Sequence, residues 1–319
     1  MSIPEVQEPP EVPHTDDGGR TTERTAPHIG DTMGATRGIF RQYMAGVPHL
    51  RRLAHYTHTD WDFSVGSTGD LDYDTIGCNV VAALTRVNDL LAPVGTGALI
   101  RTVVHGSRGA LICASIVEGE QVVAVAPDPT SRQSLRDEPT RLADMAVAAM
   151  VTEIRDSFGQ RPQAPGGYGR DEVPDPFAWT PPDAGSALES RIRAVLDPVE
   201  LQYVAVLYDG SMELVRDVFD EPAAEVYFRA GYTPAVRRDF YARFLPTLER
   251  HAQEIGGIVN PAVGRGLRRL VLDVQRGAIY YYRVDPRTYL VGVTLNQDRV
   301  PHADLKTEWL SRPPSAEVP

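Results

Sequence analysis

The chain has 319 residues, and 42% of them are hydrophobic, which is enough to bury one large core or two ordinary ones. Its 32 basic and 43 acidic residues give a formal charge of −11. This balance argues against a general nucleic-acid binder, because such proteins need a basic surface to displace counterions. The sequence shows neither a signal peptide nor an apolar run of about 18 residues, so we expect a cytoplasmic protein without a membrane-spanning helix. Two cysteines, Cys78 and Cys113, fit a reducing compartment.

The first predicted elements are a tail, a helix and a strand. Residues 1–28 are rich in proline and acids and almost free of apolar side chains. Such a segment cannot bury enough surface to offset its ordering entropy, so we expect a disordered tail. An irregular helix, weakened by glycines and Pro48, is expected from about Asp31 to Leu53. A half-buried strand follows, because apolar and polar residues alternate around Trp61, Phe63 and Val65.

A second helix, three strands and a closing helix complete the first half. Asp74 or Thr75 can cap this helix. Its apolar residues have helical spacing and are Ile76, Val80, Leu84, Val87 and Leu91. Strands are expected at 99–104, 110–117 and 121–126, joined by short glycine-containing turns. The closing helix begins near Pro139 and carries Leu142, Met145, Ala149 and Ile154.

The remaining residues repeat this order after a linker. Prolines and glycines dominate residues 159–184, which we interpret as an inter-domain linker. Asp209-Gly210 predicts a tight hairpin turn, and Pro246 should kink or split the helix that surrounds it. The expected helices are 188–196, 233–248 and 303–310, and the expected strands are 203–208, 212–219, 267–274, 278–284 and 289–295. Residues 312–319 form a polar, proline-rich tail.

The two halves contain a repeated segment. Residues 93–125 align without a gap with residues 261–293, an offset of 168 positions. Chance would give roughly two identical positions at one fixed offset, whereas the alignment contains nine identities: Pro93/Pro261, Leu99/Leu267, Arg101/Arg269, Val103/Val271, Arg108/Arg276, Gly109/Gly277, Ala110/Ala278, Val123/Val291 and Val125/Val293. Apolar positions mostly stay apolar. Each half thus contains a helix, a hairpin, a helix, a three-stranded meander and a helix, an order typical of an α+β fold.

Residues 185–311 resemble a Roadblock/LC7 domain, which has the profilin-like fold that longin domains also use. Residues 29–158 resemble a degenerate copy in which the first hairpin is reduced to residues 55–72. The resemblance rests on the element order and the apolar pattern. It implies two Roadblock-like domains in tandem, of the bacterial type, each with a five-stranded antiparallel sheet flanked by helices.

This resemblance implies a non-enzymatic role. Family members typically dimerise through the first meander strand and the long central helix, and in bacteria they often bind or regulate small Ras-like GTPases or act as scaffolds. An exposed first meander strand also invites pairing, because its outer N–H and C=O groups lack partners. The two copies can therefore form an intramolecular pseudo-dimer, or the chain can form a homodimer. The alternatives are a peptide-binding, secretion-type chaperone of the YbjN-like kind and a module that senses a small ligand.

Candidate partner-binding residues include the two arginines at the start of the repeated strand. Arg101 and Arg269 occupy equivalent positions. One interpretation is a contact to an acidic surface, on a GTPase or on the other half of the chain. The other is an edge charge that discourages aggregation.

Aromatic residues supply the other interface candidates. Tyr280 and Tyr282 belong to a run of three tyrosines, and Phe240 and Phe244 lie on one face of the helix that begins at Thr233. Since strands place residues on both faces of a sheet, part of the tyrosine set is core and part is a candidate interface patch, in which tyrosine is enriched.

No motif for catalysis or for a cofactor is present. A His-x-x-His-x-Asp-x-Asp run has residue types that bind metals, but on a strand His55 and His58 should diverge, and zinc needs converging ligands. An aspartate-rich segment at 70–74 lacks the glycine and glutamate of a calcium loop. Gly95-Thr-Gly97 precedes a strand, whereas a phosphate loop precedes a helix. We therefore predict no catalytic, metal-binding or cofactor-binding residues. The His-x-x-His-x-Asp-x-Asp segment, called the metal-like run below, consists of His55, His58, Asp60 and Asp62.

Overall fold

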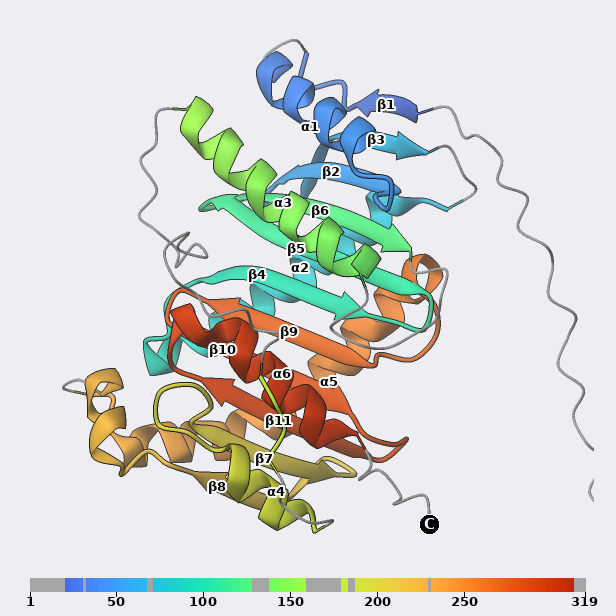
Figure 1. The fold of residues 1–319 in the computed structure, drawn as a ribbon. Coiled ribbons are helices and arrows are strands. Elements are labelled where there is room, and N and C mark those ends of the chain that lie inside the picture. The colour runs from blue at the N-terminus through green and yellow to red at the C-terminus, as the bar shows by residue number, and fades with distance from the viewer. Residues whose placement is uncertain are drawn as a thin grey trace, which may run out of the picture.

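A computed structural model describes the chain over residues 21–30, 33–67, 71–127, 138–158, 179–182, 187–228 and 231–312. Within these residues the strands form one eleven-stranded antiparallel sheet (Figure 1). The strands are β1 (Thr21–Thr25), β2 (Arg52–Thr57), β3 (Asp60–Ser67), β4 (Leu99–His105), β5 (Gly109–Val117), β6 (Glu120–Pro127), β7 (Tyr203–Tyr208), β8 (Ser211–Asp217), β9 (Arg269–Val274), β10 (Gly277–Arg283) and β11 (Thr288–Thr294). Their order across the sheet is β1-β3-β2-β6-β5-β4-β9-β10-β11-β7-β8.

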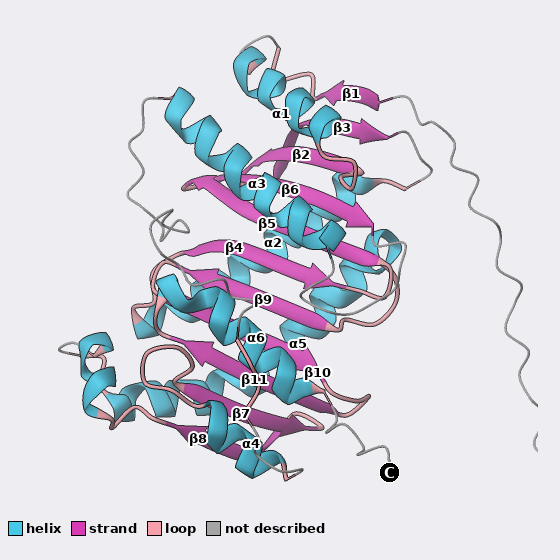
Figure 2. Cartoon of the chain, in the orientation of Figure 1, coloured by secondary structure: helices cyan, strands magenta, loops and turns pink. Residues whose placement is uncertain are grey.

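Helices cover both faces of this sheet, which gives three layers (Figure 2). The helices are α1 (Gly34–Gly46), α2 (Tyr73–Leu91), α3 (Glu138–Ser157), α4 (Leu188–Val195), α5 (Pro234–Val263) and α6 (Val300–Ser311). α2 and α5 share one hydrophobic core on one face, and α1, α3, α4 and α6 share a second core on the other. Each core includes residues from both halves of the sequence. The fold is thus α+β, and the strands expected in two five-stranded sheets lie in one continuous sheet.

The sheet has the same strand order on either side of its centre. From the centre outwards, the first half reads β4-β5-β6-β2-β3 and the second half reads β9-β10-β11-β7-β8. At the centre, Val103 of β4 pairs with Val271 of β9, and these two residues are equivalent in the sequence repeat. A pseudo-two-fold axis therefore passes between them. α2 and α5 pack against each other beside this axis, where Arg86 forms an ion pair with its own equivalent, Glu254.

The first half has an additional strand that sequence reasoning missed. Residues 21–25 pair with β3 as β1, so the predicted disordered tail is wrong for this segment. Thr21, Thr22 and Thr25 are β-branched and favour an extended backbone. Arg24 forms an ion pair with Asp74, which fixes the strand to α2. Ala26, also in the predicted tail, is buried. Residues 1–20 lie outside the described residues, as does most of the predicted linker.

Two other boundaries differ from the sequence prediction. The first helix ends at Gly46, because Gly46 and Pro48 oppose its continuation, and the residues expected to end it form β2. Asp72, rather than Asp74 or Thr75, caps α2 by accepting a hydrogen bond from the Thr75 N–H.

α5 runs through Pro246 as one helix, so of the predicted kink or split the split does not occur. The buried Phe244, Leu245 and Leu248 on either side anchor it in the core. Packing therefore outweighs the missing backbone hydrogen bond at the proline.

The tight turn predicted at Asp209-Gly210 is confirmed. Asp209 has φ 46° and Gly210 has φ 76°, and both residues join β7 to β8. Positive φ at both central residues matches a two-residue turn whose twist suits an antiparallel hairpin. His58 occupies the corresponding turn between β2 and β3 and also has a positive φ, of 57°.

The buried ion pair between Arg52 and Asp74 generates a stability prediction. Arg52 Nη2 lies 2.8 Å from Asp74 Oδ1, and both side chains are buried. Asp74→Ala should reduce the free energy of unfolding by about 3–5 kcal/mol, because it leaves the guanidinium buried without its carboxylate. Urea unfolding measures this loss. As a control, Asp239→Ala removes the exposed pair with Arg243 and should cost less than about 1 kcal/mol. Equal losses in the two variants would contradict the prediction.

Candidate functional site

The centre of the sheet is the natural candidate site, because the strands predicted to be exposed edges meet there. β4 and β9 pair along Leu99–His105 and Arg269–Val274. Backbone hydrogen bonds continue past both ends of the pair: Arg276 N donates to Thr96 O at 2.9 Å, and Arg108 N donates to Val263 O at 2.8 Å. The edge groups that were expected to invite a partner are therefore satisfied within the chain.

Arg101 forms an ion-pair network across this junction. Its Nε and Nη2 each lie 2.6 Å from Asp273 Oδ2 on β9, and its Nη1 lies 2.6 Å from Asp144 on α3. Asp273 is 2% exposed. Burial raises the pKa of the Asp273 carboxyl to about 6, against the opposing effect of the Arg101 charge. The network joins both halves of the sheet to α3.

Arg269 makes the corresponding contacts in the second half, with different partners. Its Nη1 lies 3.0 Å from His105 Nε2, and it forms an ion pair with Asp304 on α6. Burial and the neighbouring Arg269 lower the pKa of His105 well below its usual value. His105 is therefore neutral, and its Nε2 accepts a hydrogen bond from Arg269. The Tyr282 hydroxyl donates to the same Asp304 carboxylate at 2.7 Å.

The six predicted interface residues do not form an outer surface. Each arginine side chain is only 12–13% exposed. The four aromatic residues are buried: Phe240, Phe244, Tyr280 and Tyr282. This burial corrects the expected tyrosine patch, because α6 covers that face of β10 and the Tyr280 hydroxyl donates to the Val300 carbonyl at 2.7 Å. The structure places Arg101 against an acidic group of the other half, one of the two partners considered for it.

The side chains of the metal-like run in the first hairpin do not converge on one point. His55 Nδ1 lies 2.7 Å from Asp62 Oδ2, and both side chains are buried. Burial alone would lower the pKa of His55, but the Asp62 and Glu120 carboxylates raise it. His58 lies in the turn, and Asp60 is exposed. Over the described ranges, no group of three or more His, Cys, Asp or Glu side chains is placed to hold a metal ion.

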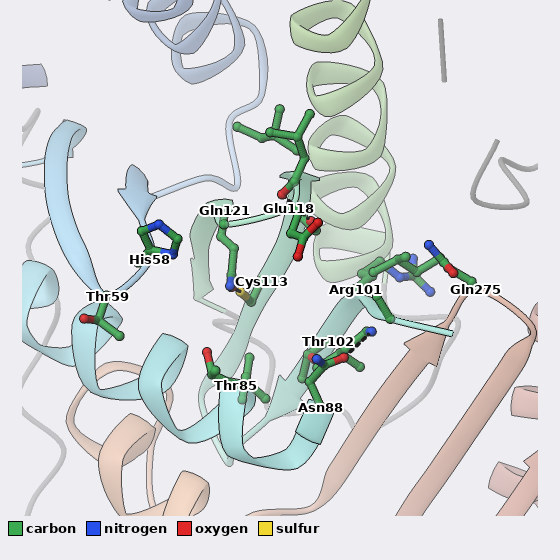
Figure 3. Close-up of a pocket in the computed structure, with 18 of the residues that line it drawn as sticks. His58, Thr59, Thr85, Asn88, Arg101, Thr102, Cys113, Glu118, Gln121 and Gln275 are labelled. Carbon is green, nitrogen blue, oxygen red and sulfur yellow. Dashed lines mark hydrogen bonds between the residues drawn. The ribbon is translucent and has the colours of Figure 1, made fainter. Parts of the chain in front are cut away.

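A cavity that sequence reasoning missed lies beside the junction, between α2 and the sheet (Figure 3). Its volume is about 790 Å³. Thr85 and Asn88 line it from α2, and Thr102, Cys113 and Gln121 line it from β4, β5 and β6. No sequence motif marks these residues. The only available signal was a comparison of side-chain sizes at equivalent positions of the two repeats.

The outer face of α3 carries exposed apolar side chains. Met145 is 55% exposed and Leu142 is 37% exposed, and Phe158, just after the helix, is 51% exposed. The inner face carries Val147 and Ile154, which are buried against the sheet. Exposed apolar residues grouped on one helix are typical of a binding surface.

Comparisons with known proteins give a limited result. No protein-family model and no curated protein sequence matches the chain. One similar solved structure is the crystal structure of a Roadblock/LC7 domain from Streptomyces avermitilis, at 14% sequence identity and a TM-score of 0.32. The similarity covers 38% of this chain and 96% of that chain. In the part of the chain that the structure describes, no helix has the length and apolar character needed to cross a membrane.

Asp273 gives the junction a predicted pH dependence. Its folded-state pKa of about 6 exceeds the ordinary value of 3.8. Folding therefore favours the protonated carboxyl, and this group's contribution to stability is lost as the pH rises through about 6. Asp273→Asn lacks this titration, so its free energy of unfolding relative to the wild type should rise by about 1–3 kcal/mol between pH 4 and pH 7.

Urea unfolding of both proteins at the two pH values measures the difference. The same experiment at high salt is the control, because salt screens buried charges much less than exposed ones. A difference that is independent of pH, or one that falls as the pH rises, would rule out this account of Asp273.

Proposed function

We propose that the chain is a non-enzymatic, cytoplasmic protein-interaction module made of two Roadblock-like domains, over residues 29–158 and 185–311, which scaffolds or regulates a protein partner. One observation carries this proposal. Roadblock/LC7 domains typically dimerise through the first meander strand and the long central helix. In this chain the corresponding elements meet at the pseudo-two-fold axis, where β4 pairs with β9 and α2 packs on α5. The chain would then be an intramolecular pseudo-dimer. The partner class implied by the resemblance is a small Ras-like GTPase.

The internal pairing limits where a partner can bind. β4 and β9 are no longer edges, and the inner faces of α2 and α5 are buried. Among the described residues, the surfaces that remain available include the exposed apolar face of α3, with Leu142 and Met145, and the outer edges of β1 and β8 at the two ends of the sheet. We place the partner on α3, because apolar side chains on a helix supply more binding energy than backbone groups alone.

The internal pseudo-dimer predicts the solution state. Since the dimerisation strand is already occupied, the protein should sediment as a monomer of 35.0 kDa. Sedimentation velocity over a hundredfold range of concentration, on the order of 1 to 100 μM, tests this, because a homodimer with a dissociation constant in that range would be visible. A single species with twice the monomer mass would show that the junction does not replace homodimerisation.

The α3 face predicts the effect of charge substitutions on partner binding. Tagged wild-type protein should retain a small Ras-like GTPase, with different yields in GDP and in a GTP analogue. The double variant Leu142→Lys/Met145→Lys should reduce retention at least about tenfold, because it places desolvated charges in an apolar contact. Val236→Lys, an exposed apolar position on α5 that is 40% exposed, is the matched control and should retain the partner normally.

Quantitative mass spectrometry of the retained proteins reads out this experiment. Retention of no protein would contradict the interaction function, and equal retention by the double variant would move the partner away from α3. Retention of unfolded polypeptides in either nucleotide would favour the peptide-binding chaperone instead.

A further inference from the structure

The two halves fill the space between central helix and sheet with different side chains. On the α5 side of the sheet, the rings of Tyr281 and Tyr289 stack with their centroids 4.7 Å apart. The offset of the sequence repeat places Cys113 and Gln121 at the equivalent positions of the first half. Neither residue can fill the volume of a tyrosine ring.

Neighbouring positions show the same trend. Arg283, Arg287 and Gln253 of the second half correspond to Ser115, Gly119 and Thr85 of the first half. All three first-half residues line the cavity. At five equivalent positions the first half thus has the smaller side chain. In the second half Tyr281 is buried and Tyr289 and Arg283 are half-buried, whereas Arg287 and Gln253 are exposed.

The central helix approaches the first meander strand more closely in the second half than in the first. In the second half a Cβ placed on Gly256 of α5 would lie only 3.1 Å from Leu267 Cβ, so the helix touches the start of the meander closely. At the equivalent place in the first half, Asn88 of α2 extends its Oδ1 to accept a hydrogen bond from Leu99 N at 2.7 Å. An asparagine side chain therefore spans a gap that a glycine closes in the other half.

The strands that floor this cavity are irregular. The register shifts between Leu99 and Arg101 on β4 and between Ser115 and Val117 on β5. Bulges of this kind re-aim side chains and are common beside binding sites.

One polar group inside the cavity has no partner. The Thr102 side chain lines the cavity, its residue is 1% exposed, and its hydroxyl makes no hydrogen bond to any described residue. A buried hydroxyl without a partner costs about 1–3 kcal/mol, which a ligand that bonds to it would recover. Thr102 pairs with Cys113 across β4 and β5. Figure 3 shows Thr102 beside Asn88, and Cys113 beside Gln121.

The charges of the cavity lining do not favour an anionic ligand. Cys113 donates to Gln121 Oε1 at 3.0 Å, and burial raises the pKa of its thiol to about 12, so it stays protonated. The two arginines of the lining are already bonded, Arg101 to Asp273 and Asp144 as described above, and Arg155 to backbone carbonyls of β5. Asp89, Glu118 and His58 also line the cavity, and the two carboxylates disfavour an anion there. The remaining polar side chains of the lining are mostly amides and hydroxyls, which suit an uncharged ligand.

We propose that this cavity binds a small, uncharged, planar aromatic molecule that carries one hydrogen-bonding group. Its ring takes the place that Tyr281 and Tyr289 fill in the second half, and its polar group bonds to the Thr102 hydroxyl. The site is independent of the protein partner, because none of its lining residues lies on the exposed apolar face of α3.

Three small molecules test the chemistry of the site. p-Cresol reproduces a tyrosine side chain, benzamide is a neutral planar amide, and benzoate is an anion of nearly the same shape. Isothermal titration of the full chain should show one site for p-cresol and for benzamide. Benzoate should bind at least about tenfold more weakly, because the lining offers its charge no unpaired cation.

Variants that copy the second half test the location. Gln121→Tyr, and the double variant Cys113→Tyr/Gln121→Tyr, should fill the cavity and weaken p-cresol binding at least about tenfold. Thr102→Val should weaken p-cresol binding by about fivefold to tenfold through the lost hydrogen bond. Arg243→Ala, an exposed change on α5 outside the lining, should leave the affinity unchanged.

Thermal unfolding checks that each variant is folded, and the single Gln121→Tyr decides the question if the double variant is not. Two results would overturn the proposal: wild-type protein that binds neither p-cresol nor benzamide, or p-cresol binding that survives in a folded Gln121→Tyr variant.

Discussion

The pairing of β4 with β9 is the interaction on which the rest of the structure depends. Without this pairing, β4 would end a six-stranded sheet and β9 a five-stranded one, each with a row of unpaired backbone groups; here each strand satisfies the other. Once they pair, the equivalent arginines Arg101 and Arg269 are largely removed from solvent on both sides of the axis. These arginines therefore need carboxylate partners, which Asp273, Asp144 and Asp304 provide. Through these contacts the junction also fixes α3 and α6.

Joining the halves within one chain allows them to differ. In a homodimer the same residue occupies a position on both sides of the interface, so it must fit both environments. In a fused pair the two sides can carry different residues, and only this one pairing has to fit. The two contacts beside Val103 and Val271 show this freedom. On one side of the axis Arg101 meets the ionisable Asp273, and on the other side Arg269 meets a neutral His105 and takes its charge partner from α6.

The sequence predicted the parts of the fold that depend on local pattern. Alternation and turn residues located the meander strands and the Asp209-Gly210 hairpin, because these signals are contained in a few neighbouring residues. Which helix covers a given face of the sheet is not encoded in neighbouring residues. Tyr280 and Tyr282 lie on a strand wherever α6 packs, so periodicity could not separate core from interface. β1 was missed since a short threonine-rich segment gains its order from pairing with β3. The cavity had a readable signal in the pairs Cys113/Tyr281 and Gln121/Tyr289.

The same asymmetry extends to the ends of the sheet. In the described part of the chain, the first half ends with the additional strand β1, which the Arg24–Asp74 ion pair holds on β3, while the second half ends at β8. Duplicated halves with equal ends and equal helix–sheet spaces would offer two identical binding sites. Within the described ranges, the exposed apolar face of α3 and the cavity occur on the first half only. The proposed partner would therefore bind once per molecule, because the pseudo-symmetry that builds the sheet does not extend to these surfaces.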